Sequence, residues 1–365
     1  MFEYSGAIHM HSTYSDGTGT VPEIVGYANE SGLDFIILTD HNNMKAKEAG
    51  YEKWFGNTML IVGYEINDIH NKNHYLAMGT KETVGTFKLL EDGELGNVLS
   101  AQEYVSEINK LGGFGFIAHP DEIRAHIPDH PSYPWNAWDS DKFTGIEIWN
   151  HMSEWIEGLN EKNKLNRFIH PLKSIVSPEE VTLKKWDELN EKRKVTAIGG
   201  VDAHAHKQNV MGFFEVEIFA YKILFKSIRT HVLLDDEINK GDASSFEDDK
   251  FKILNALRNG NSFIVNNYHG AGTGFRFFAE YEKNSYCMGE EIFFDKNKNK
   301  KIILRAYLPE KARIRLIQNG KCIDELTALD CIWDSDEPGS YRIECWKEDK
   351  GWIFSNHIRV TEVES

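Results

Sequence analysis

The first two-thirds of the chain alternates short apolar runs with stretches of helical spacing. The expected strands cover residues 7–10, 35–39, 59–66, 75–79, 114–118, 145–149, 196–199 and 213–219. Strands that alternate with helices are typical of a parallel sheet or barrel. We therefore expect an α/β fold for this part of the chain.

Two of the intervening helices have recognisable starts. Ser100 and Glu103 form a capping-box pattern, and apolar residues follow at helical spacing as far as Leu111. Ser177 and Pro178 combine an N-cap residue with proline at the first helical position. This second pattern predicts a helix that reaches about residue 194.

The pattern changes at about residue 236. Residues 235–250 are polar and acidic, which indicates a surface connection, and a helix is expected over 251–258 before Asn259 and Gly260. The expected strands beyond it cover 275–281, 301–307, 313–318, 340–346 and 357–360. Short strands at this spacing, without long helical patterns, suggest a small β-sandwich.

These patterns predict three parts. They are a barrel over residues 1–235, a connecting segment with a helix packed on the barrel over 236–270, and a β-sandwich-like domain over 271–365.

Composition excludes some partners. The formal net charge of −16 argues against nucleic-acid binding, because phosphate backbones are held by an excess of Lys and Arg. The sequence has no run of about 18 apolar residues, so no membrane span is expected. The N-terminal apolar run leads directly into the histidines and is expected to leave no room for a removable signal. The four cysteines lack CxxC spacing and are expected to be buried free thiols. The prediction is a cytoplasmic protein.

Acidic residues and histidines gather at the ends of the apolar runs. They are His9, His11, Asp16, Asp40, His41, Glu65, His74, His119, Asp202 and His204. In an α/β barrel, the C-terminal ends of the strands converge on one face. Because side chains alternate with period two, His9 and His11 are expected to share one side of a strand, as are Asp202 and His204.

This set predicts a polynuclear metal site. A single histidine at a strand end is more simply a hydrogen-bonded structural residue. Burying so many ionisable groups together without a cation would be costly, however. Imidazole and carboxylate ligands together suit manganese, iron or zinc.

The same motifs, in the same order, resemble a known family. His9-x-His11-Ser12, Ser15-Asp16-Gly17, Thr39-Asp40-His41, Glu65, His74, His119-Pro120 and Asp202-Ala203-His204 are similar to the PHP (polymerase and histidinol phosphatase) superfamily. The resemblance spans roughly residues 1–210. It implies a distorted (β/α)7 barrel, similar to a TIM barrel, that holds two or three divalent metal ions.

The resemblance also implies how the ligands are shared. His9, His11, Glu65 and Asp202 would hold one metal; Asp16, His41 and His204 a second; Glu65, His74 and His119 a third. Glu65 would then bridge two ions of a trinuclear metal centre.

The C-terminal part has a resemblance of its own. Residues 251–265 and the segments 339–344 and 352–358 look like the CehA/McbA-like branch of the superfamily. That branch adds a small β domain to the barrel, and its named members hydrolyse carbamate or amide bonds. The superfamily as a whole consists mostly of phosphoesterases, so both kinds of bond stay open.

The expected function is a metal-dependent hydrolase in which a hydroxide held between two metals attacks the substrate. A phosphoesterase acting on a small, anionic, phosphorylated molecule is the first candidate. A carbamate, amide or ester hydrolase with the same metals is the second. The third is a non-catalytic barrel with structural metals and a β interaction domain, which the ligand types disfavour because structural zinc sites are usually closed and cysteine-rich.

Three further residues are candidates for catalytic roles. Asp40 is expected to orient ligand histidines, though it could touch a metal. Arg124 is the best-placed cation for a phosphate, or else a solvated loop residue, and the acidic Asp121-Glu122 after His119-Pro120 weakens the phosphate interpretation. His206 is a candidate proton donor to the leaving group, or a histidine at the rim.

The segment 128–138, rich in Pro, Tyr and Trp, is expected either to cover the substrate or to pack on the fold.

Overall fold

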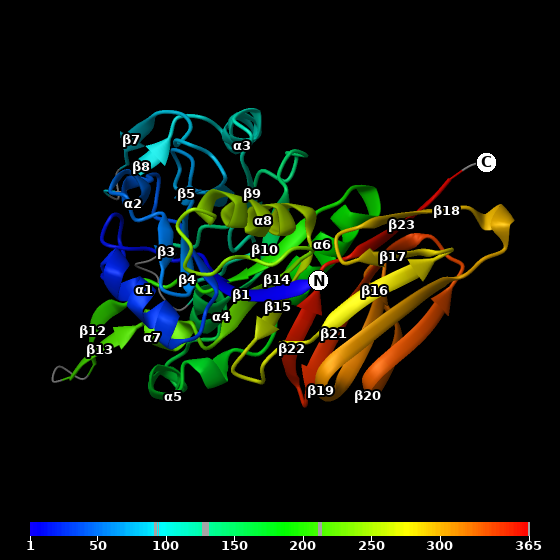
Figure 1. The fold of residues 1–365 in the computed structure, drawn as a ribbon. Helices are drawn as coiled ribbons and strands as arrows, with labels where there is room; N and C mark the ends of the chain where they lie inside the picture. The colour runs from blue at the N-terminus through cyan, green and yellow to red at the C-terminus, as the bar shows by residue number, and fades with distance from the viewer. Residues whose placement is uncertain (91–92, 94, 126–130, 211–213, 364–365) are drawn as a thin grey trace.

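The computed structural model describes residues 1–90, 93, 95–125, 131–210 and 214–363. The N-terminal two-thirds is a mixed α/β structure, and the C-terminal part consists of strands (Figure 1). The predicted α/β class and the β-rich C-terminal part are therefore both present.

Two sheets build the α/β part. The first runs β3 (Lys53–Phe55), β4 (Thr58–Val62), β2 (Phe35–Leu38), β1 (Phe2–Ile8), β14 (Ile228–Leu234) and β15 (Ser262–Asn266). The second runs β5 (Tyr64–Ile66), β6 (Tyr75–Met78), β9 (Phe114–Ile117), β10 (Gly145–Asn150) and β11 (Thr196–Gly200). Both contain parallel and antiparallel pairs, whereas the sequence pattern is typical of a parallel sheet or barrel.

The sheets meet at both sides without forming one closed ladder. At one side Gly63 separates β4 from β5, where a single strand was expected; a Cβ at this position would lie 2.5 Å from Ala77 O. At the other side Val201 N donates to Ile8 O at 2.9 Å, and Asp202 N donates to His9 O at 2.7 Å. The described strands thus form two abutting sheets, and the closed (β/α)7 barrel stays a prediction.

One hydrophobic core fills the space between the sheets. Its residues alternate along the strands and include Ile8, Phe35, Ile37, Met59, Ile61, Leu76, Phe116 and Ile198, all buried. A second core lies between the opposite strand faces and the helices α1 (Val21–Glu30), α3 (Ala101–Lys110) and α6 (Glu180–Lys192). Burial on both faces explains why these strands read as continuous apolar runs.

The predicted helix starts have different outcomes. At α3, Glu103 Oε2 accepts a hydrogen bond from Ser100 N at 2.8 Å, as the capping box predicts. The start of α6 at Ser177 and Pro178 is wrong, because its N-cap is Glu179. α8 (Phe246–Asn259) begins inside the segment expected to be a connection and ends at Gly260, whose φ of 80° suits a helix C-cap.

Shorter elements connect these layers. The helical ones are α2 (Lys45–Glu48), α4 (His151–Glu157), α5 (Lys164–Ile169), η1 (Leu172–Ser174) and α7 (Tyr221–Leu224). Two hairpins complete this part: β7 (Phe87–Leu89) with β8 (Leu95–Asn97), and β12 (His206–Val210) with β13 (Phe214–Ile218). Among the described residues, no helix has the length and apolar composition that a membrane crossing needs.

The C-terminal strands continue the first sheet. They are β16 (Arg276–Tyr281), β17 (Asn284–Cys287), β18 (Glu291–Phe294), β19 (Ile302–Gln318), β20 (Lys321–Ser335), β21 (Gly339–Lys347), β22 (Lys350–Ser355) and β23 (Ile358–Glu362), with η2 (Lys296–Lys298) between β18 and β19. β15 pairs with β14 on one side and with β22 on the other, so its backbone joins the two parts (Figure 1). Their own core includes Phe277, Ile314, Tyr341 and Trp352.

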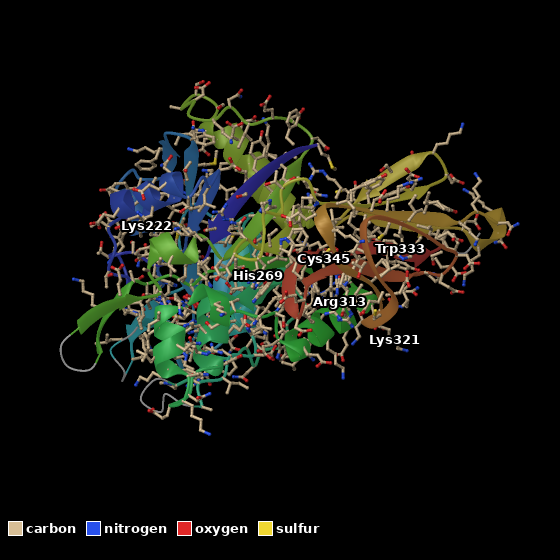
Figure 2. All side chains as sticks on the ribbon, turned by 90° about the horizontal axis from the view of Figure 1, so that it is seen from below. Lys222, His269, Arg313, Lys321, Trp333 and Cys345 are labelled. Carbon is tan, nitrogen blue, oxygen red and sulfur yellow. The ribbon has the colours of Figure 1, made fainter. Side chains whose placement is uncertain are left out.

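Two expectations for the C-terminal part need correction. The strands expected at 301–307 and 313–318 are one strand, β19, with an irregularity between Tyr307 and Ala312. All four cysteines are unpaired; Cys345, labelled in Figure 2, is buried with Cys287 and Cys331, but Cys322 is exposed. Cys322 lies on β20, which has few buried positions because it pairs with β19 alone among the described strands.

Candidate metal centre

Nine predicted ligands come together where the strands of the two sheets end. They form four overlapping groups whose ligand atoms lie within 4.8 Å of one another: His11, Asp16, His41 and His204; His9, Glu65 and His119; His9, His11 and Asp202; His41, Glu65 and His74. His9, His11, His41 and Glu65 each belong to two groups. The structure therefore brings all nine residues into one continuous cluster.

The backbone that presents these ligands is not regular strand. His9, His119 and Asp202 have φ values of 67°, 27° and 53°, which L-residues rarely adopt. Such conformations persist only where the surroundings hold them, and they concentrate at functional sites. His9 and His11 both face Glu65, as expected, but strand alternation is not the cause, because β1 ends at Ile8; Asp202 likewise lies beyond the end of β11.

Glu65 lies at the middle of the cluster. Its Oε2 lies 3.1 Å from His9 Nε2, 3.2 Å from His11 Nε2 and 3.5 Å from His41 Nδ1. Its Oε1 lies 2.7 Å from His74 Nδ1 and 3.2 Å from His119 Nε2. One buried carboxylate thus contacts five histidines, which is the arrangement that a bridging ligand needs.

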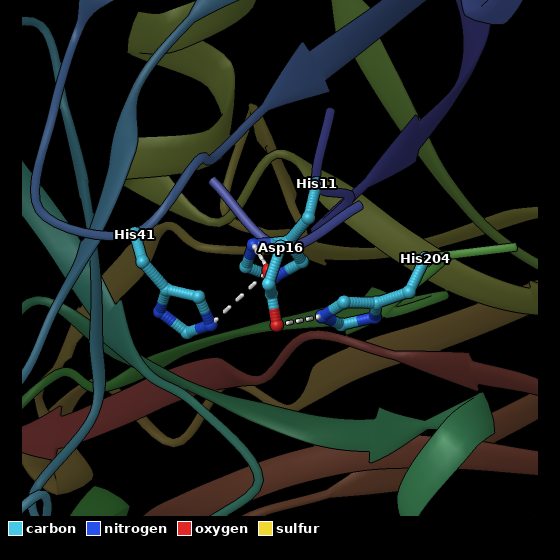
Figure 3. Close-up of side chains that lie close together, drawn as sticks. All are labelled: His11, Asp16, His41 and His204. Carbon is cyan, nitrogen blue, oxygen red and sulfur yellow. Dashed lines mark ion pairs between the residues drawn. The ribbon is translucent and has the colours of Figure 1, made fainter. Parts of the chain in front are cut away.

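Two aspartates complete the cluster. Asp202 Oδ1 lies 3.4 Å from His9 Nε2 and 3.5 Å from His11 Nε2. Asp16 Oδ2 lies 3.3 Å from His204 Nε2, and its Oδ1 lies 3.6 Å from His11 Nδ1. Figure 3 shows the Asp16 carboxylate between the rings of His41 and His204.

The carboxylates are held in their charged form. Burial alone would raise the pKa of Asp16, but His204, His41 and His11 outweigh it and hold that pKa well below its usual range. Burial is likewise outweighed at Glu65 and Asp202, whose pKa values the surrounding histidines lower.

The histidines respond to the same charges. Burial lowers the pKa of His11, but Asp202, Glu65 and Asp16 outweigh burial and raise it to about 10. At His41 burial prevails over Asp16 and Glu65, and its pKa falls to about 4. Protons on histidines and divalent cations are alternative ways to neutralise these carboxylates, so binding a cation would release protons.

The donor set fits divalent cations. The His11 ring is fully buried, and its nitrogens lie 3.2 Å from Glu65 Oε2 and 3.6 Å from Asp16 Oδ1 without hydrogen-bond geometry to any described residue. Buried polar atoms are nearly always hydrogen-bonded, so this ring calls for another kind of partner. Imidazole nitrogens and carboxylate oxygens in this proportion suit manganese, iron or zinc.

Asp40 lies one layer behind the cluster. Its Oδ1 accepts hydrogen bonds from Ser12 N at 2.6 Å and from Ser15 Oγ at 2.7 Å, and its Oδ2 accepts one from Ser12 Oγ at 2.8 Å. These contacts hold the loop that carries Asp16. Ser12 follows His11 and Ser15 precedes Asp16, so Asp40 contacts neighbours of two predicted ligands; its role in orienting ligand histidines stays a prediction.

His206 lies at the rim of the cluster. It begins β12 and is half-buried, and its ring stacks on that of His204 with centroids 5.0 Å apart. Burial, together with His204, lowers the pKa of His206. The ring therefore favours its neutral form at pH 7.

Arg124 approaches the cluster through an aromatic ring. Its guanidinium carbon lies 4.8 Å from the centre of the Tyr133 ring, which stacks on His74 at 5.0 Å between centroids. Its Nη2 donates to Glu122 Oε1 at 2.9 Å. Lys72 Nζ lies 5.4 Å from the centre of the same Tyr133 ring.

The described part of the aromatic segment, residues 131–138, packs on the fold and also contacts a predicted ligand, while its covering of a substrate stays a prediction. Tyr133 lies against His74 and so covers the cluster, whereas Trp135 is buried in the core. Trp135 N donates to Pro120 O at 2.9 Å, which ties the segment to the strand end at His119. Residues 128–130 lie outside the described part of the chain.

Sequence reasoning missed Glu147 on β10. Its Oε1 accepts a hydrogen bond from His9 Nδ1 at 2.8 Å, and its side chain is fully buried. The available signal was a single charged residue inside the apolar run Ile146–Trp149.

Comparison with known families agrees with this geometry. Residues 7–125 match the profile of the PHP domain. This stretch of the chain is a PHP domain. Seven of the nine clustered residues lie within the matched span of the PHP domain, and Asp202 and His204 follow it. No curated protein matches the chain.

Two solved structures are similar to this PHP domain protein. One is a two-domain protein from Bacteroides vulgatus containing a predicted PHP-like metal-dependent phosphoesterase; it is 16% identical, and the match covers 98% of this chain and 95% of that one, with a TM-score of 0.42. The other is an amidohydrolase from Chromobacterium violaceum with bound sulfate and no metal; it is 14% identical, over 60% and 95% of the chains, with a TM-score of 0.30. The CehA/McbA-like branch stays a prediction.

Proposed function

We propose that this PHP domain protein is a metal-dependent hydrolase, and that its substrate is a small anionic phosphate ester. The observation that carries the proposal is the overlap of the four ligand groups at Glu65, His9, His11 and His41. Cations held by overlapping groups would share ligands, and one substrate could then contact more than one of them. Paired metals of this kind stabilise both the attacking and the leaving oxygen of a displacement.

The ligand sets follow the family resemblance. His9, His11, Glu65 and Asp202 would hold one ion; Asp16, His41 and His204 a second; Glu65, His74 and His119 a third. In the structure, His74 groups with His41 and Glu65, and His119 groups with His9 and Glu65. When bound, such ions supply an activated water at neutral pH and neutralise charge that develops on the substrate.

The chain's own side chains would orient the substrate. The lowered pKa of His206 disfavours its protonated, imidazolium form. The neutral ring is therefore suited to hydrogen-bond the leaving group. Arg124 and Lys72 place positive charge beside His74, as an anionic substrate requires. Arg124 Nε makes no hydrogen bond with any described residue, so a donor remains for phosphate.

A specific observation favours the second candidate, a carbamate or amide hydrolase. The pocket beside His119 and Asn150 is also lined by acidic side chains, namely Asp121, Glu122, Glu154, Glu157 and Glu179. Burial raises the pKa of Glu154 to about 7 and that of Glu157 to about 8, so this lining would tolerate a neutral substrate. Glu122, whose pKa His119 and Arg124 lower against the effect of burial, would repel a phosphate.

One experiment separates the two candidates. The manganese-loaded protein is assayed against a panel of phosphate esters and a panel of aryl carbamates, with Asp202→Asn as the control variant. We expect turnover of phosphate esters, and a loss of metal and activity together in the variant. Turnover of carbamates alone would favour the second candidate, and no turnover of either panel by metal-loaded protein would contradict both.

A further inference from the structure

Glu147 is a buried carboxylate outside the nine predicted ligands that contacts two of them, His9 and His119. Its Oε1 accepts a hydrogen bond from His9 Nδ1 at 2.8 Å, on the side of the ring away from Glu65. Its Oε2 accepts one from the backbone N of His119 at 2.9 Å. The same Oε2 accepts one from Asn150 Nδ2 at 2.9 Å.

Asn150 extends this contact to another ligand. Its Nδ2 also lies 3.2 Å from Asp202 Oδ2. One carboxylate therefore connects, directly or through Asn150, ligands that follow three different strands: His9 after β1, His119 after β9 and Asp202 after β11.

The local structure of β10 makes this arrangement possible. Side chains three residues apart on a regular strand point to opposite faces. The pairing of β10 with β11 shifts between Glu147 and Trp149, which inserts Ile148 as an extra residue. The shift brings Glu147 and Asn150 to the same side.

The neighbouring strand leaves room for the carboxylate. A Cβ at Gly200 would lie 1.8 Å from Glu147 Oε1 and 2.9 Å from the Cβ of His9. Glycine at this position therefore allows the contact between Glu147 and His9.

We infer that Glu147 is a positioning residue, which holds the His9 ring with Nδ1 protonated so that Nε2 faces the metal centre. Its carboxylate determines which nitrogen of His9 is available to a cation, and it anchors the strained backbone at His119. Partners behind a ligating histidine fix the tautomer and orientation of its ring. This inference rests on the proposed metal site and adds a residue that the nine ligands do not include.

The test replaces Glu147 with Gln in the full-length chain. A carboxamide cannot accept both from His9 Nδ1 and from the two donors now at Oε2, because one of its two ends is an NH₂ group. We expect the affinity for one manganese ion to fall by roughly 10- to 100-fold, with the remaining ions unaffected. Calorimetric manganese titration and metal content after dialysis measure this.

Glu154→Gln is the matched control. Glu154 also accepts three hydrogen bonds, from Trp149 Nε1, Val176 N and Ser177 N, but touches no predicted ligand. We expect its manganese affinity to match that of the wild type. Equal losses in both variants, or no loss in folded Glu147→Gln, would overturn the inference.

A second measurement keeps the inference testable if Glu147→Gln does not fold. In zinc-loaded wild-type protein with 15N-labelled histidine, the His9 signals are assigned by their loss in His9→Gln. We expect a protonated Nδ1 and a metal-bound Nε2; binding through Nδ1 would overturn the inference. Both measurements work without turnover, so an inactive protein that binds metal would contradict the proposed function and leave the role of Glu147 testable.

Discussion

Two buried clusters of charged side chains in this chain neutralise their carboxylates in different ways. Between α6 and β21, Arg342 forms two contacts of 2.7 Å with Asp187 and one of 2.7 Å with Glu344. His357 Nε2 lies 2.8 Å from Asp187 Oδ1. In the metal centre, the ion pairs that Asp16, Glu65 and Asp202 make with other described residues are all with histidines.

The difference teaches how a binding site differs from a structural ion network. A guanidinium is permanently charged and saturates carboxylates with fixed geometry, so the cluster at Arg342 leaves no place for a cation. A histidine can lose its proton and become a ligand. The clearest sign that the metal centre is a binding site is the fully buried His11 ring, whose nitrogens have hydrogen-bond geometry to no described residue.

The largest effect is expected from a substitution that breaks the ion network at Arg342. Arg342→Met leaves buried Asp187 with His357 and buried Glu344 with Arg315, without the guanidinium between them, and should lower the free energy of unfolding by roughly 3–5 kcal/mol. Urea denaturation measures this. Lys222→Ala, which removes an exposed ion pair with Glu30 (Lys222 is labelled in Figure 2), should change stability little. Loss of bound metal without loss of stability in Arg342→Met would contradict the comparison.

The next effect concerns the other cluster. Glu65→Gln removes the shared carboxylate that contacts five histidines, and should reduce both bound metal and kcat/KM by on the order of 100-fold or more. Elemental analysis and steady-state kinetics measure the two quantities. Glu3→Gln, which alters a carboxylate–histidine pair with His231 outside the metal centre, is the control and should retain metal. Full metal content in Glu65→Gln would contradict the bridging role.

A third prediction concerns a buried histidine that has no carboxylate partner. Burial lowers the pKa of His151 to about 3, from 6.5 when unfolded. The unfolded chain therefore binds this proton first, so stability is constant above pH 6.5 and is lost as the pH falls below it. At pH 5 this amounts to about 2 kcal/mol. Urea denaturation between pH 5 and 7 should show a weaker pH dependence in His151→Gln than in the wild type; equal slopes would contradict this assignment.

The smallest effect tests the substrate. Arg124→Gln should raise the KM for phosphate esters by roughly tenfold, the equivalent of about 1.4 kcal/mol, because one charge-assisted contact is lost. Arg193→Gln, at an arginine that packs on Phe143 outside the metal centre, is the matched control and should leave KM unchanged. An unchanged KM in Arg124→Gln would remove Arg124 from the substrate site.

The predictable parts of the fold are those with a local pattern. The capping box at Ser100 and the stop at Gly260 depend on neighbours within a few residues, and both are found. β14, in the middle of the first sheet, was not expected, although all but one of its residues are buried. Its sequence, with Arg229, Thr230 and His231 beside apolar residues, lacks a continuous apolar run; His231 is instead paired with Glu3 of the neighbouring β1.

By itself, the sequence determined the residue types of the candidate site, their order along the chain and their place at strand ends. Only the tertiary structure decided which ligands lie within reach of one another, the position of Glu147 behind His9, and the joining of the C-terminal strands to the first sheet through β15. The physical reason is range. Periodicity and capping report interactions between near neighbours, whereas Glu147 and His9 are 138 residues apart and meet only after the strands have packed.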